Sequence, residues 1–187
     1  MQSAKIGVYT RSFHSYPKVW NLGHPSVKEI FEDEVEVQEK IDGSQLSFGK
    51  DHDGTIHIRS KNREFPINGP DSLFERAAEQ IAKRADKLPV GYTFRGEYLN
   101  KPKHNCLVYD RTPIDNIVIF DVTSDLHQYL EPSTVARMAE ELVFEHVKST
   151  TMKISSIDDV KELMELPSML GGKREGLVFK NYKRSLS

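Results

Sequence analysis

The sequence predicts an α+β fold, in which short strands form antiparallel meanders and helices are inserted between them. Runs of strand length with alternating or apolar residues recur along the chain, and turns that contain glycine separate several of them. Longer stretches between these runs place apolar residues at helical spacing. Antiparallel meanders with inserted helices indicate an α+β fold.

The expected strands begin after an irregular segment at 5–30, which carries the aromatic residues Tyr9, Phe13, Tyr16 and Trp20. The strand Val35–Lys40 would pair with a strand at 44–48 as a hairpin around the Asp42-Gly43 turn. A second turn, at 51–54, leads into a strand at 55–60. Further strands are expected at 92–99, 116–122 and Gly176–Lys180, the last after a Gly171-Gly172 turn.

Helical spacing of apolar residues predicts three helices, at 72–87, 132–147 and 157–166. Ser72 and Glu75 have the spacing of a capping box at the start of the first helix. Ser156 and Asp159 form a similar capping pair at the start of the third. These signals place the helix starts more firmly than the helix ends.

Composition is typical of one ordinary globular domain, because the chain has 187 residues, of which 37% are hydrophobic and 29% charged. A single cysteine, Cys106, excludes an internal disulfide framework and suits a reducing compartment, so we expect a cytoplasmic protein. No apolar run reaches membrane-spanning length, and the start lacks a signal-peptide pattern. The net charge of −2 makes no general case for nucleic-acid binding. The basic segment 173–187 suits either phosphate contact or a solvated surface.

The most informative stretch is Lys40-Ile41-Asp42-Gly43, which ends the first expected strand. A lysine at a rigid strand end can project into a pocket and attack a nucleotide phosphate. Taken alone, this short pattern also fits an ordinary solvated lysine beside a turn. Its meaning therefore depends on whether the later parts of the chain carry motifs that belong with it.

Five segments in order resemble the motifs of the covalent nucleotidyltransferases, the superfamily of RNA ligases, DNA ligases and mRNA capping enzymes. The resemblance spans most of the chain, from Glu39 to Lys180. The lysine motif is followed by a short polar motif, a strand with a glutamate, a strand with an aromatic residue, and a glutamate-glycine-hydrophobic-lysine motif. The segments are Glu39-Lys40-Ile41-Asp42-Gly43-Ser44-Gln45, Ser60-Lys61-Asn62, Phe94-Arg95-Gly96-Glu97-Tyr98, Ile117-Val118-Ile119-Phe120-Asp121 and Glu175-Gly176-Leu177-Val178-Phe179-Lys180.

Within the superfamily the chain looks most like the ATP-dependent RNA ligases. Gly43-Ser44-Gln45 and the stretch at 101–105 resemble that branch, whereas DNA ligases usually carry an arginine soon after the motif glycine. The resemblance implies two antiparallel sheets that form a nucleotide cleft flanked by helices, an adenylyltransferase fold of ATP-grasp-like kind. It implies ATP, a covalent lysyl-AMP intermediate, and Mg²⁺ or Mn²⁺. It also implies a monomer that joins RNA ends, a 5′-phosphate to a 3′-hydroxyl, including ends at a nick in a duplex, without a membrane partner.

The resemblance makes Lys40 the nucleophile, which must attack as a neutral amine. A free lysine side chain loses its proton only near pH 10.4, about three pH units above neutrality, so nearby cations would be needed to release it. A bound Mg²⁺, Lys180 and Lys61 are the candidates. Lys180 would also hold phosphate.

The remaining nucleotide contacts are implied by the same resemblance. Asp42 and Glu175 would hold the metal, and Glu97 would accept hydrogen bonds from the ribose. Without the resemblance, Asp42 would be an ordinary turn aspartate, Glu175 part of a charged strand rim, and Glu97 an exposed strand residue. The backbone of Glu39 would face adenine, with Ile41 and Gln45 beside the nucleotide.

Either Phe120 or Ile117 would cover the base, since strand alternation puts these two residues on opposite faces. By the same alternation Glu175 and Lys180 would face opposite sides. His104 and Arg111 could contact phosphates, although a structural role suits His104 better.

The last motif of the superfamily, a strand with two lysines, has no clear counterpart after Lys180, where Lys183 is one candidate. We therefore expect either a truncated chain or an unusually short natural one, and prefer truncation. Residues 1–187 would be a single adenylyltransferase domain without a separate C-terminal nucleic-acid-binding domain, impaired in self-adenylylation and with little or no strand sealing.

Three alternatives stay open: a DNA ligase, a GTP-dependent capping guanylyltransferase, and a nucleotide-binding module without full ligase activity.

Overall fold

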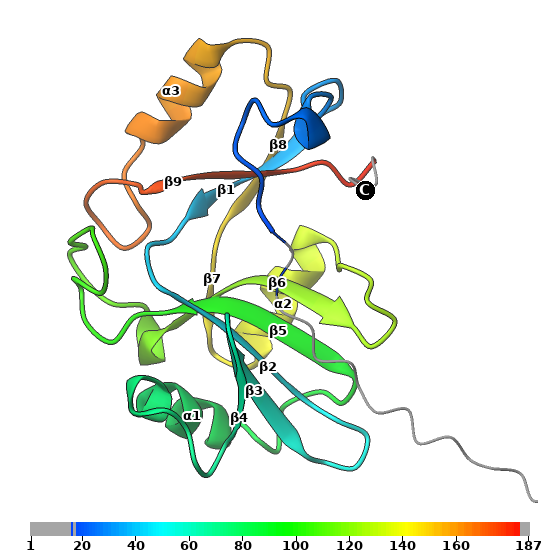
Figure 1. The fold of residues 1–187 in the computed structure, drawn as a ribbon, viewed down its shortest axis with the longest axis vertical. Helices are drawn as coiled ribbons and strands as arrows, with labels where there is room; N and C mark the ends of the chain where they lie inside the picture. The colour runs from blue at the N-terminus through cyan, green and yellow to red at the C-terminus, as the bar shows by residue number, and fades with distance from the viewer. Residues whose placement is uncertain (1–15, 17, 184–187) are drawn as a thin grey trace, which may run out of the picture.

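The computed structural model describes residue 16 and residues 18–183, so Tyr9, Phe13 and the chain end at 184–187 lie outside the described residues. Figure 1 shows two sheets, one above the other, each with its own helices. This confirms the α+β fold. The small sheet has the order β8-β1-β9, with β1 at Val35–Lys40, β8 at Ser149–Met152 and β9 at Gly176–Lys180.

The large sheet has six strands in the order β4-β3-β2-β5-β6-β7. All neighbouring strands are antiparallel except β6 and β7, which are parallel. The strand bounds are β2 at Ser44–Lys50, β3 at Ile56–Ser60, β4 at Glu64–Pro66, β5 at Tyr92–Tyr98, β6 at Ile117–Ser124 and β7 at Glu145–His146.

The expected hairpin between the first two strands is wrong. β1 pairs with β8 and β9, whereas β2 pairs with β3 and β5, so the turn Ile41–Gly43 carries the chain from one sheet to the other. A Cβ on Gly43 would lie 2.9 Å from the Tyr98 carbonyl oxygen, so only glycine fits this close approach. The turn after Lys40 is therefore pressed against the end of β5.

The helices are shorter than the sequence predicts. α1 spans Glu75–Ala82 after a 3₁₀ turn at Ser72–Phe74, and the side chain of Asp71, rather than that of Ser72, caps that turn. α2 spans Pro132–Glu141, and the chain then turns at Val143 (φ 58°) so that Leu142 and Phe144 enter the core. α3 spans Ile157–Glu165 and has the predicted capping box of Ser156 and Asp159. Two further 3₁₀ turns lie at Pro25–Val27 and Ile114–Asn116.

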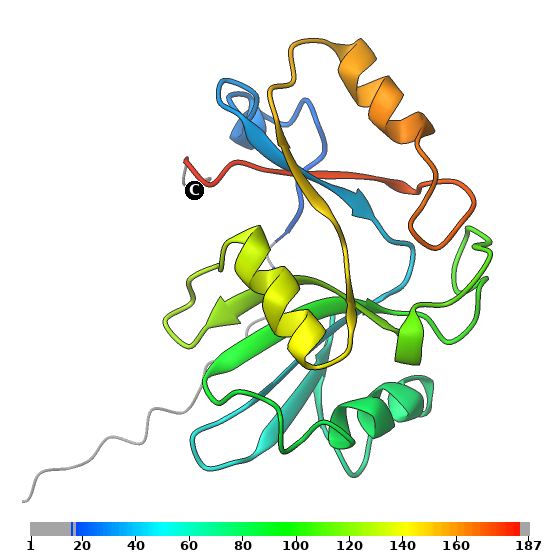
Figure 2. The same cartoon turned by 180° about the vertical axis from the view of Figure 1, so that it is seen from behind.

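Three apolar clusters hold these layers together. The largest lies between the large sheet and helices α1 and α2, and a second lies between the small sheet and α3 (Figure 2). The third lies beside the turn at 41–43, where β6 of the large sheet meets connecting segments of the chain, and contains Ile41, Leu99, Tyr109, Val118, Val147 and Leu170. The segments that connect the two sheets are therefore packed against the large sheet.

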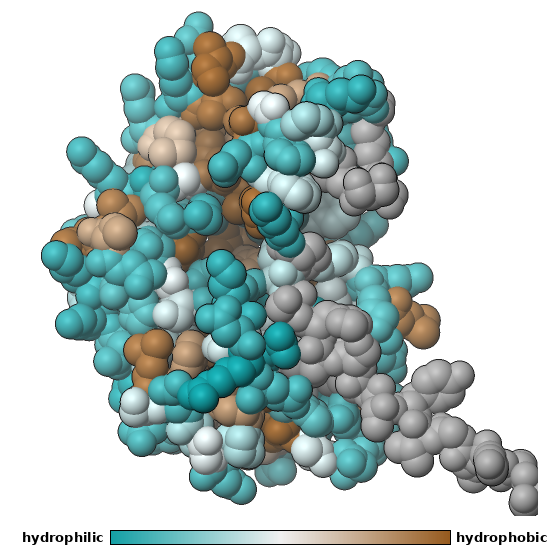
Figure 3. Space-filling model, in the orientation of Figure 1, coloured by the Kyte–Doolittle hydropathy of each residue, from teal (hydrophilic) through white to brown (hydrophobic). Residues whose placement is uncertain are grey.

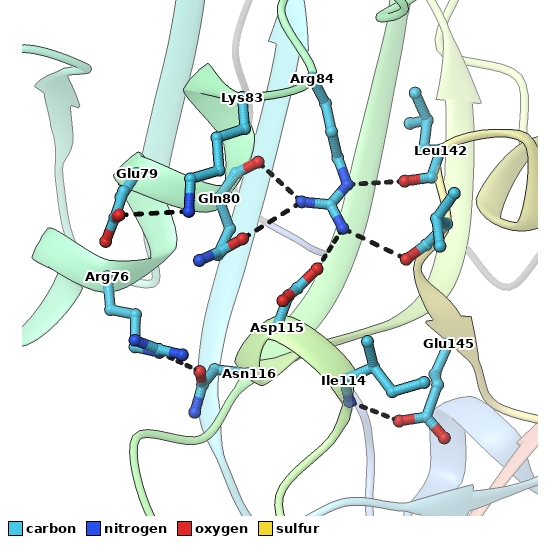
Figure 4. Close-up of polar contacts among 11 residues, drawn as sticks. Arg76, Glu79, Gln80, Lys83, Arg84, Ile114, Asp115, Asn116, Leu142 and Glu145 are labelled. Carbon is cyan, nitrogen blue, oxygen red and sulfur yellow. Dashed lines mark hydrogen bonds and ion pairs between the residues drawn. The ribbon is translucent and has the colours of Figure 1, made fainter.

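Arg84 ties the end of α1 to the end of α2, as Figure 4 shows. Its guanidinium donates to the carbonyl oxygens of Leu142 (2.6 Å), Val143 (3.2 Å) and Gln80 (2.9 Å), and it pairs with Asp115 at 2.5 Å. Carbonyl groups at the C-terminal end of a helix lack hydrogen-bond donors within the helix, and Arg84 supplies donors to the carbonyls that follow α2. In the described part of the chain, no helix is long and apolar enough to cross a bilayer.

Candidate active site

A cavity of about 800 Å³ lies between the two sheets, a volume typical of small-molecule sites. Figure 3 shows this face of the molecule hollowed between the upper and lower sheets, with apolar residues deep in the hollow. Ten residues that the sequence predicts in the nucleotide site line the cavity. They are Glu39, Lys40, Ile41, Asp42, Gln45, Lys61, Glu97, Phe120, Glu175 and Lys180.

Lys40 is the last residue of β1, and its side chain is about half exposed. Its Nζ lies 3.1 Å from Oε1 of Glu175, the residue immediately before β9. The prediction that Glu175 and Lys180 face opposite sides is wrong, because both line the cavity. Glu175 precedes the first residue of β9 and so escapes the alternation of that strand.

Glu97 extends from β5 into the same cavity. Burial and the nearby Glu175 carboxylate raise the pKa of Glu97 to about 8, against the opposing effect of Lys40. The carboxyl is therefore largely protonated at neutral pH and can both donate and accept hydrogen bonds. Vicinal hydroxyls of a sugar offer both kinds of partner.

Asp42 is buried, and its Oδ2 accepts hydrogen bonds from the backbone N–H groups of Cys106 (2.8 Å) and Leu107 (2.7 Å). Among residues 16 and 18–183, no three acidic, histidine or cysteine side chains gather closely enough to hold a metal unaided. Mg²⁺ usually binds through one or two carboxylates together with water and substrate phosphates. Asp42 and Glu175 line one cavity and offer hard oxygen ligands, so they fit a metal that arrives with phosphate.

Phe120 on β6 and Val178 on β9 both line the cavity, one from each sheet. Ile117 is fully buried in the core beneath the large sheet, so the alternative that Ile117 covers the base is wrong. An aromatic ring and a branched aliphatic side chain can hold a planar base between them. Sequence reasoning missed Val178, although its position two residues before Lys180 on one strand would have placed both on one face.

Lys180 has its charge already paired within the protein. Its Nζ lies 2.8 Å from Oδ2 of the buried Asp121 and 3.4 Å from the carbonyl oxygen of Phe120. The hydroxyl of Tyr16 donates to the same Asp121 oxygen at 2.6 Å, and burial next to this carboxylate raises the Tyr16 pKa. Gln38 also donates to the Phe120 carbonyl, at 3.3 Å, so side chains from two strands of the small sheet, β1 and β9, hold the carbonyl of a residue in the large sheet.

Three further sequence candidates do not line the cavity. His104 contacts Ser44 Oγ at 2.7 Å through Nε2, which agrees with the structural role, and burial lowers its pKa. Arg111 makes a two-pronged ion pair with Glu145 at 2.7 and 2.8 Å. Lys183 donates its backbone N–H to Asn181 beyond the end of β9. Residues that line the cavity without being predicted include Tyr16, Lys18, Val19, Gln38, Asn62, Asn105, Val147 and Val178.

A lysine at a strand end, in a cleft between two sheets and beside carboxylates and an aromatic ring, is the arrangement expected of a covalent nucleotidyltransferase. The sequence model of the family described as RNA ligase matches residues 33–186, so the chain belongs to the RNA ligase family. No curated protein matches the chain.

Solved structures of Naegleria gruberi RNA ligase share the fold. The structure with PPi has a TM-score of 0.68 at 20% identity and covers 92% of this chain and 54% of that chain. A mutant with ATP and Mn has a TM-score of 0.67 at 21% identity, covering 90% of this chain and 53% of that chain. Another mutant, with AMP and Mn, has a TM-score of 0.59 at 20% identity, covering 83% of this chain and 48% of that chain. The chain thus spans about half the length of these structures.

Proposed function

We propose that this chain is the adenylyltransferase part of an ATP-dependent RNA ligase and that Lys40 becomes covalently attached to AMP. The observation that carries the proposal is the cavity, in which a lysine Nζ at a strand end lies 3.1 Å from Glu175 and shares the space with Glu97 and Phe120. An amine so placed can reach a phosphate bound in the same cavity.

In the first reaction, the protonated Lys40 Nζ passes a proton to water, and the neutral amine attacks the α-phosphorus of ATP and then loses a second proton to water. A nitrogen–phosphorus bond forms, the bond from that phosphorus to the bridging oxygen of the β-phosphate breaks, and pyrophosphate leaves. The attack needs the neutral amine, because a protonated amine has no free electron pair. The Oε1 of Glu175, at 3.1 Å from Nζ, is well placed to orient the amine beforehand.

The other residues would hold the nucleotide. Adenine would lie between Phe120 and Val178, where stacking on an aromatic side chain contributes roughly 1–3 kcal/mol. Glu97 would bind the ribose hydroxyls, and the backbone at Glu39 would face the edge of the base, because the Glu39 side chain is engaged with the backbone N–H of Met169. Ile41 and Gln45 complete the walls.

Mg²⁺ or Mn²⁺ would be held by Asp42 and Glu175 together with phosphate oxygens, and when bound it supplies positive charge beside the phosphates. Structures of the Naegleria gruberi relative with ATP or AMP and Mn support this pairing of nucleotide and metal. Lys61, exposed at the cavity, would add charge there.

The partners would be RNA ends, in single strands or at a nick in a duplex. AMP would pass from Lys40 to a 5′-phosphate, and a 3′-hydroxyl would then displace AMP to form the phosphodiester bond. Family membership supports RNA over DNA as the substrate. We propose a monomer that works in the cytoplasm.

The test is covalent labelling with ATP that carries a radioactive α-phosphate, in the presence of Mg²⁺, followed by a denaturing gel. We expect label on the wild-type chain and on Lys148→Ala, which removes an exposed lysine outside the cavity, but none on Lys40→Ala. Labelling by GTP instead of ATP would favour a capping guanylyltransferase. Bound but unattached ATP would favour a nucleotide-binding module, and transfer of AMP to DNA ends in preference to RNA would favour a DNA ligase.

A further inference from the structure

The loop of residues 100–109, which follows β5, holds the three consecutive residues that lead from the lysine motif into β2. Asp42, Gly43 and Ser44 each make a hydrogen bond to this loop. In Figure 1 the loop lies at the left edge, between the two sheets and near the segment that leads into β9. Each of these three residues beside Lys40 is therefore hydrogen-bonded to the loop.

Asp42 contributes the strongest of these contacts. Its Oδ2 accepts from two consecutive backbone N–H groups, those of Cys106 and Leu107, at 2.8 and 2.7 Å. Hydrogen bonds to an ionised acceptor are about twice as strong as neutral ones. One carboxylate oxygen of the lysine motif is therefore committed to the loop.

Tyr109 holds the backbone of the same residue. Its hydroxyl oxygen accepts from the backbone N–H of Asp42 at 2.8 Å, and the ring is buried with Ile41 and Leu170 in the apolar cluster beside the turn at 41–43. The ring is almost completely buried, so apolar packing positions the hydroxyl that accepts from this N–H.

Two side chains of the loop continue the contact. Asn105 donates through Nδ2 to the carbonyl oxygen of Gly43 at 2.8 Å. His104 accepts at Nδ1 from the backbone N–H of Asn100, so in the neutral ring Nε2 carries the proton and donates to Ser44 Oγ at 2.7 Å.

The loop also reaches the segment that leads into Glu175. The backbone N–H of Asp110, the next residue after the loop, donates to the carbonyl oxygen of Leu170 at 3.1 Å. The neighbouring Met169 donates its N–H to Glu39, the residue before Lys40, at 2.9 Å. Hydrogen bonds therefore connect both sides of Lys40 to the same structure. Glu39 is bonded to the segment 169–170, that segment is bonded to the end of the loop, and the loop is bonded to Asp42.

We propose that loop 100–109 is a positioning clasp, which orients Lys40 toward the α-phosphate by holding the turn at 42–44 and the approach to Glu175 together. Tyr109 is its main positioning residue, because its hydroxyl holds the backbone of the turn from within the apolar cluster. This inference rests on the proposed function for its consequence, attack by Lys40, but the clasp itself is a property of the chain without nucleotide.

The test is Tyr109→Phe, which removes one hydroxyl and leaves the Asp42 N–H without its acceptor. We expect the rate of Lys40 adenylylation at saturating ATP to fall by roughly 10- to 100-fold, because small misplacements of a reacting group have effects of that size. The ATP concentration for half-maximal rate should change less than about threefold, since Tyr109 does not line the cavity. The matched control is Tyr92→Phe on β5, whose ring packs on the main core and whose hydroxyl is outside the clasp.

A readout that needs no nucleotide separates this proposal from the proposed function. Amide hydrogen exchange and the NMR signal of the Lys40 side chain should change in Tyr109→Phe, with faster exchange at Asp42, and not in Tyr92→Phe. Failure of the wild-type chain to form lysyl-AMP would sink the proposed function, and unchanged exchange and Lys40 signals in Tyr109→Phe would sink the clasp. An adenylylation rate in Tyr109→Phe within about twofold of the control would also overturn it, since such a gap is below about 0.5 kcal/mol.

Discussion

Replacing Glu97 with glutamine should make the folded chain more stable at alkaline pH than the wild type, while the two are similar near pH 5. The pKa of Glu97 stands at about 8 in the folded chain, against an ordinary value of 4.5. Between these two values the unfolded chain has released a proton that the folded chain still holds. Wild-type stability therefore falls as the pH rises through this window.

The size of the effect is set by the width of that window. Each pH unit corresponds to about 1.4 kcal/mol, so the limiting loss is roughly 4–5 kcal/mol. Because the carboxyl keeps some contact with water in the cavity, we expect the free energy of unfolding of the wild type to fall by about 2–4 kcal/mol between about pH 5 and about pH 8.5. Glutamine has no proton to release and should not show this loss.

Urea unfolding of both chains at several pH values measures the difference directly. Glu162→Gln, on the exposed surface of α3, is the matched control and should follow the wild type. Parallel stability curves for the wild type and Glu97→Gln would refute the conclusion that Glu97 is held neutral. Buried acids that destabilise a fold are common at functional sites, where their binding role outweighs the loss of stability. Glu97→Gln should therefore bind ATP less tightly than the wild type, although it is more stable at alkaline pH.

Three other substitutions test separate parts of the structure. Phe120→Ala should weaken ATP binding by about 1–3 kcal/mol in calorimetry, while Phe120→Trp retains it; equal affinities for both variants would exclude stacking. Lys180→Met leaves Asp121 buried without its cation and should lower the free energy of unfolding by about 3 kcal/mol, and an unchanged midpoint in denaturant would show that the pair is unimportant. Arg84→Met removes the partner of Asp115 and of the α2 carbonyls, and should cost about 3 kcal/mol without changing ATP affinity; a loss of affinity at equal stability would contradict a purely structural role.

The residues of the cavity could be predicted from the sequence because they belong to short motifs that resemble, in the same order, those of the covalent nucleotidyltransferases. Lys40, Glu97 and Phe120 come from three different strands, yet their order along the chain was enough to expect them together. The resemblance carries this information without any knowledge of strand pairing in this chain. The particular role of each residue stays a prediction.

Strand pairing itself could not be predicted, because an Asp-Gly turn between two strands fits a hairpin and a crossing between sheets equally well. The short strands β4, β7 and β8 are too brief for a periodic signal. The second helix was expected to continue to residue 147, because the apolar residues Leu142 and Phe144 suit a helix and a buried turn alike. Tertiary packing determines both the strand pairing and the end of the second helix.

The clasp around the lysine motif was also invisible in the sequence. Asp42 was expected to hold a metal, and nothing in its neighbourhood along the chain indicated that the amides of Cys106 and Leu107 occupy one of its oxygens. Contacts between residues so far apart in the chain depend on the three-dimensional fold.

Peptide mass spectrometry of the chain after incubation with ATP and Mg²⁺ shows directly whether Lys40 is the nucleophile. We expect one AMP attached through a bond to nitrogen, on the peptide that contains Lys40, and release of pyrophosphate in equal amount. The Lys40→Arg chain should carry none. AMP on another lysine, or ATP bound without any adduct in a folded chain, would contradict the claim that Lys40 is the nucleophile.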